Sequence, residues 1–486
     1  MYTTKIDNVS CMRKFIKFNI TKELVNNFKL NRQIPLHFYN REGQILVYSK
    51  TDASEEDITK LLRFNKQGIY YDKEDESILQ NNNKSDIPEG LTDTKLISEK
   101  IADKIIEGTS SLFDQLRNNV MSSIHAKNAS SKLSNIFTEF ENQEDILTGL
   151  VNIIEIMNNR KNSLDIALAT KRTTVAMAIK TRGIFTASES EKEKRKEMIS
   201  DLMLSALLCD TGTTKMKMPV HRGLLKEEMD YIRNHPLLSY LMVAHESGIK
   251  STVKHNILCH HRPLREGTVN NNYPSYSFLI KKLEFIKNKY QSEPGHIDLI
   301  KDIDMQIYLL KNDTFHDDDA NILAIASEFS SLTSEVPWRE AFSPVDAVRK
   351  MINNSLFTYS DRSIREFLDY IAISLCDNQK IINDGNFVIV NILDSDNKSH
   401  FEICTVVHSD RFQSRPTVER FATIRPIIKK DPKIHISGFD LNSITLDPRR
   451  ARFNLRNDDS RHIIYLVDCF EDEALHDKLS KISKFS

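Results

Sequence analysis

The chain has 486 residues, several times the roughly 100–150 residues of a common domain, so we expect two to four units with cores of their own. Lysine and arginine total 67 against 68 aspartate and glutamate, and this balance excludes a global field that draws a protein to nucleic acid or to an anionic membrane. The six cysteines form no C-x-x-C pair, which excludes a dense disulfide framework. No apolar run reaches the roughly 18–20 residues that cross a bilayer. We therefore expect a cytoplasmic protein with no membrane span that binds no DNA.

The first 73 residues predict a small α+β module. Alternating apolar residues on either side of the turn Asn40–Gly43 predict a hairpin over 34–49. Ser54 can cap a short helix that ends near Gly68, and Ile69–Tyr71 then indicates a return strand. Residues 74–93 are polar and are expected to form a linker.

The stretch from 94 to 355 has the apolar spacing of helices and predicts a multi-helix bundle. Within it, residues of about 275–320 form a long insertion with two runs of apolar residues at near-helical spacing, from Phe278 to Phe285 and from Ile297 to Ile307. We expect an added pair of helices that covers a pocket mouth or forms a homodimer face. The alternative is that the pair packs into the core of its own domain.

A period of two replaces the helical period in the last part of the chain. Residues 356–486 are expected to form a helix followed by a β-rich module. The turn sequence Asn383–Asn386 predicts a hairpin between 380–382 and 387–390, and 401–407 and 463–467 are further strand candidates. The fold class is therefore mainly α: a multi-helix bundle between a small α+β module and a β-rich module.

Four polar groups in the helical region could carry chemistry, because each interrupts an apolar helical stretch. They are Cys209-Asp210, His235, His260-His261 and Ser327-Glu328. Imidazole and carboxylate from several helices of one bundle can meet in a shared metal site, and a bound metal can generate hydroxide for phosphodiester hydrolysis. The alternative is that the histidines are packing residues, which His235 before Pro236 and the adjacent pair also permit.

The order of these groups resembles the HD-GYP family of cyclic di-GMP phosphodiesterases, whose domain is an HD-type helical bundle. The family carries an HD pair followed by Gly-Lys, His-Pro, His-His-Glu, a Gly-Tyr-Pro loop and Val-Ala-Asp. The matching stretches here, in the same order, are Leu207–Gly212, His235-Pro236, Cys259–Arg262, Asn272–Pro274 and Ile322–Val348. The resemblance covers most of residues 30–420 and implies a metal centre that acts on cyclic di-GMP.

The departures from the family pattern affect metal ligands. Where active members have the Glu and His of a first helix, this chain is expected to carry Ala167 and Lys171. The His of the HD pair is Cys209, and the Asp of Val-Ala-Asp is Ser327. Of the phosphate-facing basic residues, Arg339 is kept.

The remaining residues predict either no metal or a single divalent ion, with iron or manganese the best candidates. Its ligands would be Asp210, His235, His260 and His261, with Cys209 as an added thiolate. Arg339 and Lys171 are the candidates for a ligand phosphate. Lys171 could also pair with Asp210 as a fixed charge in place of a cation, or be an ordinary exposed lysine.

Three functions stay open. The first is a degenerate HD-GYP-like protein, inactive or impaired, that acts in cyclic di-GMP-linked signalling as a binding module with a protein partner. The second is an active phosphodiesterase with an altered ligand set. The third is a scaffold whose flanking modules carry the function.

Overall fold

The computed structural model divides into two compact units, Met1–Thr92 and Asp93–Ser486. The residues it describes are 15–18, 34, 36–39, 45–49, 69–72, 102–111, 113–115, 128, 163–181, 189–221, 223–261, 273–312, 318–372, 381–393, 398–409, 414–430, 434–458, 460–469 and 471–485. Among these residues, no helix is both long enough and apolar enough to cross a membrane.

The first unit contains an antiparallel sheet with the strand order β1-β4-β2-β3. Its strands are β1 (Phe15–Phe18), β2 (Phe38–Tyr39), β3 (Ile45–Val47) and β4 (Ile69–Asp72). Phe18 packs on Phe38 and Tyr71, with ring centroids 4.8 and 5.9 Å away. The predicted hairpin corresponds to β2 and β3 and the predicted return strand to β4. The helix predicted from Ser54 lies outside the described residues.

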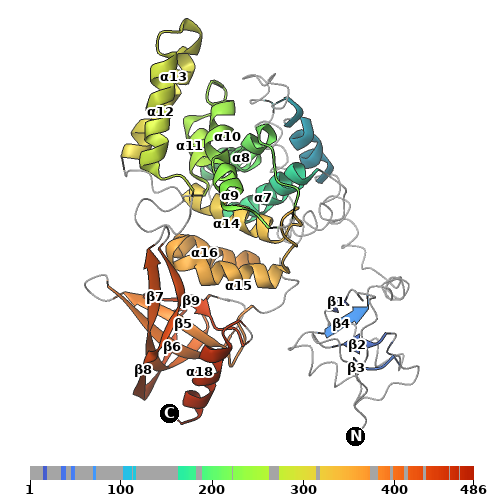
Figure 1. Cartoon of the computed structure of the whole chain (residues 1–486), viewed down its shortest axis with the longest axis vertical. Coiled ribbons are helices and arrows are strands. Elements are labelled where there is room, and N and C mark those ends of the chain that lie inside the picture. The colour runs from blue at the N-terminus through green and yellow to red at the C-terminus, as the bar shows by residue number, and fades with distance from the viewer. Residues whose placement is uncertain are drawn as a thin grey trace. The chain divides into compact units, whose positions relative to one another are not determined.

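The second unit is mainly helical in its first part (Figure 1), as the spacing predicted. Helix also covers 102–111 and 113–115. The named helices up to the insertion are α7 (Leu164–Thr181), α8 (Glu189–Leu208), α9 (Lys226–Ile232), α10 (His235–Val243) and α11 (Ser251–Cys259). After it come α14 (Asp318–Leu332), α15 (Pro344–Asn354) and α16 (Asp361–Phe367), with the short 3-10 turn η6 (Ser355–Phe357) and the π-turn η7 (Leu368–Ala372). Helix α7 is buried on every side from Ala169 to Ile179, so it is the central helix of the bundle.

The insertion contains the predicted pair of helices, α12 (Tyr276–Tyr290) and α13 (Ile297–Lys311), joined through the 3-10 turn η5 (Pro294–His296). The Ser275 hydroxyl accepts a hydrogen bond from the Phe278 amide and so caps α12. Leu279 and Leu283 on one side of α12, and Ile303 and Leu310 on one side of α13, belong to the main core of the unit. One face of the pair therefore packs into its own domain.

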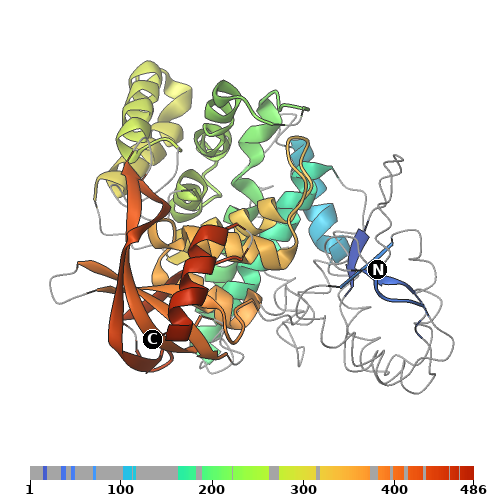
Figure 2. The ribbon, with the colours of Figure 1, turned by 60° about the horizontal axis from the view of Figure 1, so that its bottom comes forward.

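The second part of the unit is an antiparallel sheet with the order β8-β7-β6-β5-β9. Its strands are β5 (Phe387–Leu393), β6 (Ser399–His408), β7 (Thr417–Lys430), β8 (Ile434–Asn454) and β9 (Arg461–Leu466), and the helix α18 (Glu473–Phe485) follows. Figures 1 and 2 show α15 lying against this sheet. The Asn353 side chain fixes the contact, because its amide donates to the Leu466 carbonyl and its oxygen accepts from the Leu466 amide.

One expectation for the sheet needs correction. The turn before β5 is present, with Gly385 at φ +85, a left-handed conformation that glycine adopts readily. Ile381 and Ile382, however, form a buried bend and not a strand, and β5 pairs with β6 and β9. The difference arises because pairing with the distant strands outweighs the local turn signal.

Candidate metal centre

Four side chains from three places in the bundle meet at one point. Asp210 follows the end of α8 and begins the 3-10 turn η4 (Thr211–Lys215). His235 is the first residue of α10, and His260 and His261 directly follow α11. One potential ligand atom of each residue lies within 4.8 Å of those of the others. This is a group of one carboxylate and three imidazoles, suited to a borderline divalent metal such as iron, manganese or zinc.

The close approach of η4 to α10 depends on Gly212. A Cβ atom at this position would lie 2.6 Å from the His235 carbonyl oxygen and 2.6 Å from the Ser239 amide nitrogen. The Gly212 amide donates to the Ser239 hydroxyl at 2.8 Å. The missing side chain therefore allows the turn that carries Asp210 to reach the helix that carries His235.

The hydrogen bonds of two imidazoles fix their tautomers. His235 Nδ1 lies 2.9 Å from the Ile232 carbonyl oxygen, and His260 Nδ1 lies 2.8 Å from the Ile257 carbonyl oxygen. A carbonyl only accepts, so each Nδ1 must carry the proton. In the neutral rings, both Nε2 atoms then present lone pairs.

These two lone pairs point at the same place. The Nε2 atoms of His235 and His260 are 3.2 Å apart, and Asp210 Oδ1 lies 3.0 Å from the first and 3.4 Å from the second. Three acceptors converge, which is unfavourable without a positive charge between them. Such a charge could be an added proton or a metal ion, and the metal-ligand role of imidazole uses the same Nε2 lone pair.

Burial disfavours an added proton on His260 and on His261. Burial, together with the neighbouring His235, lowers the pKa of His260, although Asp210 opposes the shift. Burial and the two other imidazoles lower the pKa of His261 further. Burial disfavours ionisation of Asp210, but the charge of Arg172 and the contacts with His235 and His260 outweigh it, so the pKa of Asp210 is well below its usual range. Asp210 is therefore an anion near neutral pH.

Arg172 of α7 contacts the other side of Asp210. Its guanidinium Nη1 lies 2.6 Å from Asp210 Oδ2 and is 2 % exposed. Sequence reasoning overlooked this residue as one of several basic positions on the helix. No sequence signal marked it, because Arg172 stands among threonines and a second basic residue, and its burial follows from the packing of α7.

Lys171 does not fill the expected role. It neither pairs with Asp210 nor is exposed: its ammonium group is buried and donates to the Thr333 carbonyl at 3.1 Å. Adjacent residues on an α-helix point about 100° apart, so Arg172 faces Asp210 and Lys171 faces the end of α14. Burial lowers the pKa of Lys171 to about 8.

Cys209 lies beside the four-residue group, next to Asp210 in the chain. Ser327 is buried on α14. The Cys209 sulfur accepts from Arg172 Nη1 at 2.7 Å and donates to the Ala206 carbonyl at 3.5 Å, and it is not among the converging ligand atoms. Burial raises the pKa of Cys209 to about 12, in spite of Arg172. In this arrangement Cys209 is a buried neutral thiol.

Arg339 caps the carboxyl end of α14. Its guanidinium donates to the carbonyls of Ser331, Leu332 and Glu340, at 2.6, 3.0 and 2.8 Å. The last carbonyls of a helix have no partner within the helix, so these bonds satisfy two of them. The predicted phosphate residue is thus already engaged with backbone.

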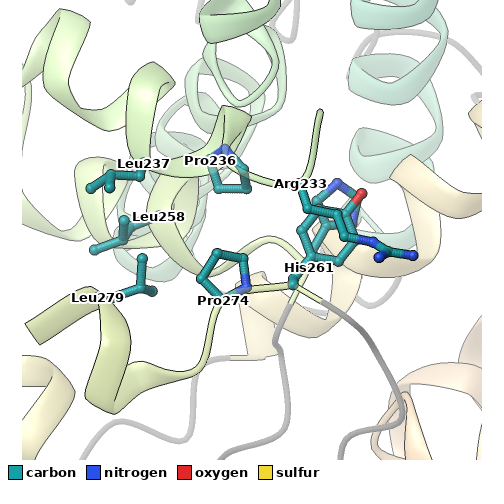
Figure 3. Close-up of a pocket in the computed structure, with 8 residues that line it drawn as sticks. Arg233, Pro236, Leu237, Leu258, His261, Pro274 and Leu279 are labelled. Carbon is teal, nitrogen blue, oxygen red and sulfur yellow. The ribbon is translucent and has the colours of Figure 1, made fainter. Parts of the chain in front are cut away.

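A small hollow adjoins the metal-ligand group. The ring of Tyr273 stacks on His261, with centroids 3.9 Å apart and planes 11° from parallel. Figure 3 shows His261 and Arg233 beside a mainly apolar floor that includes Pro236, Leu258 and Leu279. The enclosed volume of the hollow is about 10 Å³, which is room for about one water molecule. This is far less than the roughly 300–1,000 Å³ of common ligand pockets, so a ligand could contact the rim of the hollow but not fill it.

Comparison with known proteins adds little. No protein-family model and no curated protein matches the sequence. Among solved structures, the chain is similar to Bd1817, an HDG"Y"P protein from Bdellovibrio bacteriovorus, with a TM-score of 0.38 and 15% identity over 75% of this chain and 99% of that chain. A similarity at this level carries no argument about fold or function, so the case for the site depends on its own geometry.

Proposed function

We propose that Asp210, His235, His260 and His261 hold one divalent metal ion in an HD-type bundle, and that the chain acts as a cyclic di-GMP-linked binding module with impaired or no hydrolytic activity. The observation that carries the metal site is the convergence of His235 Nε2, His260 Nε2 and Asp210 Oδ1 within 3.0–3.4 Å. Each Nδ1 donates to a backbone carbonyl, so no proton of a neutral ring lies between these atoms.

Two features support a single ion and weak hydrolysis. A cluster of two metals needs bridging carboxylates, but Arg172 is bound to Asp210 Oδ2. At the position where the resembled family has a further acid, the chain has Ser327, a neutral side chain. The fixed positive charge of Arg172 also repels a second cation from this oxygen.

A bound metal ion would supply Lewis acidity toward a ligand oxygen. The protein's own contribution is orientation and charge. The Ile232 and Ile257 carbonyls hold the two imidazoles in the tautomer that ligates, and Arg172 keeps Asp210 ionised.

The proposed ligand class follows from the ordered motifs and the hollow beside them. The hollow combines the cation Arg233, the stacked rings of His261 and Tyr273, and an apolar floor. A guanidinium suits phosphate oxygens, and aromatic and apolar surfaces suit a base, so the chemistry of these side chains, and not the volume of the hollow, supports contact with one half of a cyclic dinucleotide.

The test begins with metal content. The full chain, stripped with a chelator and reloaded with Mn²⁺ or Fe²⁺, should retain one ion per chain by mass spectrometry of the metal. Calorimetry should then detect binding of cyclic di-GMP to the loaded protein, and chromatography should find turnover far below the roughly 1–10 per second of ordinary enzymes. His245→Ala, at an exposed histidine outside the cluster, is the matched control and should retain the ion.

The outcomes separate the parts of the proposal. Two ions per chain, or none, contradicts the single site. One ion without cyclic di-GMP binding removes the ligand and leaves the metal site in place. Rapid hydrolysis with one ion would establish the alternative, an active phosphodiesterase with an altered ligand set.

A further inference from the structure

The two helices that carry the imidazoles form a pair with both ligands at one end. Helices α10 and α11 are joined by the segment 244–250, and His235 begins the first helix while His260 follows the second. The Nε2 atoms of the two residues are 3.2 Å apart, so these ends lie together and the joining segment lies at the other end. The separation of the imidazoles therefore depends on how α10 is held against α11.

Asp302 of α13 is buried between these two helices. Its Oδ2 atom accepts a hydrogen bond from the Tyr240 hydroxyl of α10 at 2.9 Å, and its Oδ1 atom accepts one from the Ser251 hydroxyl of α11 at 3.0 Å. Figures 1 and 2 show the α12–α13 hairpin beside α10 and α11. One carboxylate of the insertion thus bridges both ligand-bearing helices, with one oxygen for each.

A buried lysine strengthens this bridge. Lys254 of α11 donates through Nζ to the carbonyl of Ala244, the residue that follows α10, at 2.8 Å. The same Nζ lies 3.4 Å from Asp302 Oδ1, which supplies its counter-charge. Hydrogen bonds to ionised groups are stronger than those between neutral groups. The contact among α10, α11 and α13 therefore restricts both the spacing and the rotation of the two ligand-bearing helices.

Gln306 of α13 makes a different kind of contact. Its amide donates to the Ser251 carbonyl at 3.0 Å, and its oxygen accepts from His255 Nδ1 at 3.1 Å. Both partners belong to α11, so these two bonds hold α13 against α11 without fixing α10. Asp302 differs from Gln306 because its carboxylate contacts both helices.

We propose that Asp302 is a positioning residue for the metal centre, which holds α10 and α11 at the separation that brings His235 and His260 to one ion. This inference rests on the proposed metal site. A buried ion pair is often no more stabilising than apolar residues of similar volume, so stability alone does not require Asp302 and Lys254 here. Metal–ligand distances tolerate deviations of only about 0.2 Å, and a satisfied polar network holds one arrangement of a core more strictly than apolar contact does.

Asp302→Asn tests the role of the carboxylate. The amide keeps the shape but has one acceptor oxygen and no charge, so the affinity of the full chain for Mn²⁺ should fall about 10-fold. Calorimetric titration of the metal-free protein measures this change, at a temperature at which the variant is folded by circular dichroism. Asp304→Asn on the same helix is the matched control, because its exposed carboxylate pairs with Lys287, and it should keep the wild-type affinity.

Two further measurements separate positioning from stability. The visible absorption of bound Co²⁺ depends on the geometry of its ligands, so the Co²⁺ band of Asp302→Asn should differ from that of the wild type. Asp302→Leu combined with Lys254→Met removes both charges and leaves no buried lysine without its counter-charge. This double variant should unfold near the wild-type temperature and still show the loss of Mn²⁺ affinity.

The results distinguish this inference from the proposed function. Wild-type Mn²⁺ affinity and an unchanged Co²⁺ band in Asp302→Asn would overturn the inference and leave the metal site in place. Recovery of Mn²⁺ affinity in the double variant would also overturn it, because the loss would then follow stability. Absence of Mn²⁺ binding by the wild-type chain contradicts the metal site itself, and the positioning role is then wrong as well.

Discussion

Two buried polar clusters in the second unit differ in how their donors and acceptors are matched. In the sheet, the Glu402 carboxylate accepts from Arg420 at 2.6 Å and from Arg461 at 2.8 Å, and these arginines also bind Asp447 and Asp458. Each contact joins a donor to an acceptor. In the helical bundle, His235, His260 and Asp210 instead bring three acceptors together.

The difference indicates how a structural cluster can be told from a ligand site. In the balanced cluster both oxygens of Glu402 have donors, and these bonds tie strands β6, β7 and β9 together. A cluster with converging lone pairs is complete when a cation is bound. The same bundle contains a balanced histidine for comparison: His255 Nδ1 donates to the Gln306 side-chain oxygen at 3.1 Å, and the Cys259 thiol lies 3.7 Å from its Nε2.

The comparison is tested most strongly by His260→Ala. Removal of this buried ligand should lower the affinity for Mn²⁺ by more than about 100-fold, or roughly 3 kcal/mol, because one of the converging lone pairs is lost. His255→Ala, five residues earlier, is the matched control: it should cost stability and leave the affinity for Mn²⁺ within a few-fold. Equal loss of metal in both variants would mean that the effect is one of folding and not of ligation.

The balanced cluster is tested by Glu402→Gln. The substitution leaves Arg461 and Arg420 beside a neutral amide, and should lower the free energy of unfolding by about 3 kcal/mol. Denaturation by urea measures this change. Metal stoichiometry should stay at the wild-type value, and its loss would show that the sheet and the metal site are one functional cluster.

Lys171 is a third case, because its buried ammonium donates to a neutral carbonyl, whereas the arginines of the sheet cluster pair with carboxylates. Its folded pKa of about 8 lies below the unfolded value of 10.5, so the unfolded chain binds the proton more tightly. Below pH 8 the charged Lys171 lowers the free energy of unfolding by its full amount. This cost falls as the pH rises from 8 to 10.5. Lys171→Met should therefore stabilise the protein at pH 7, by roughly 2 kcal/mol after loss of the hydrogen bond to Thr333.

The measurement is the free energy of unfolding of Lys171→Met and of the wild type across this pH range. The gain should shrink above pH 8. A constant difference would mean that hydrophobic packing, and not the buried charge, explains it.

Gly212→Ala should lower the free energy of unfolding by about 1–3 kcal/mol as η4 moves away from α10. Because η4 carries Asp210, the affinity for Mn²⁺ should fall as well. Gly295→Ala is the matched control, since a Cβ there meets no atom within 4 Å. Unchanged metal binding in Gly212→Ala would show that the position of Asp210 does not depend on this contact.

The sequence alone determined those features that local chemistry decides. Period and turn signals located the helical region, the α12–α13 pair, and strands β6 and β9. The order of polar groups in apolar helices located Asp210, His235, His260 and His261, which the fold brings together. These predictions depend on residues close together in the chain, whose spacing is visible in the sequence.

Tertiary structure alone decided the contacts between distant segments. The choice between Lys171 and Arg172 as the partner of Asp210 depends on the rotation of α7 within the bundle, and a difference of one residue turns a side chain by about 100°. The tautomers of His235 and His260 depend on carbonyls whose positions are set only when the helices have formed. Long-range packing sets both, and no spacing in the sequence encodes either of them directly.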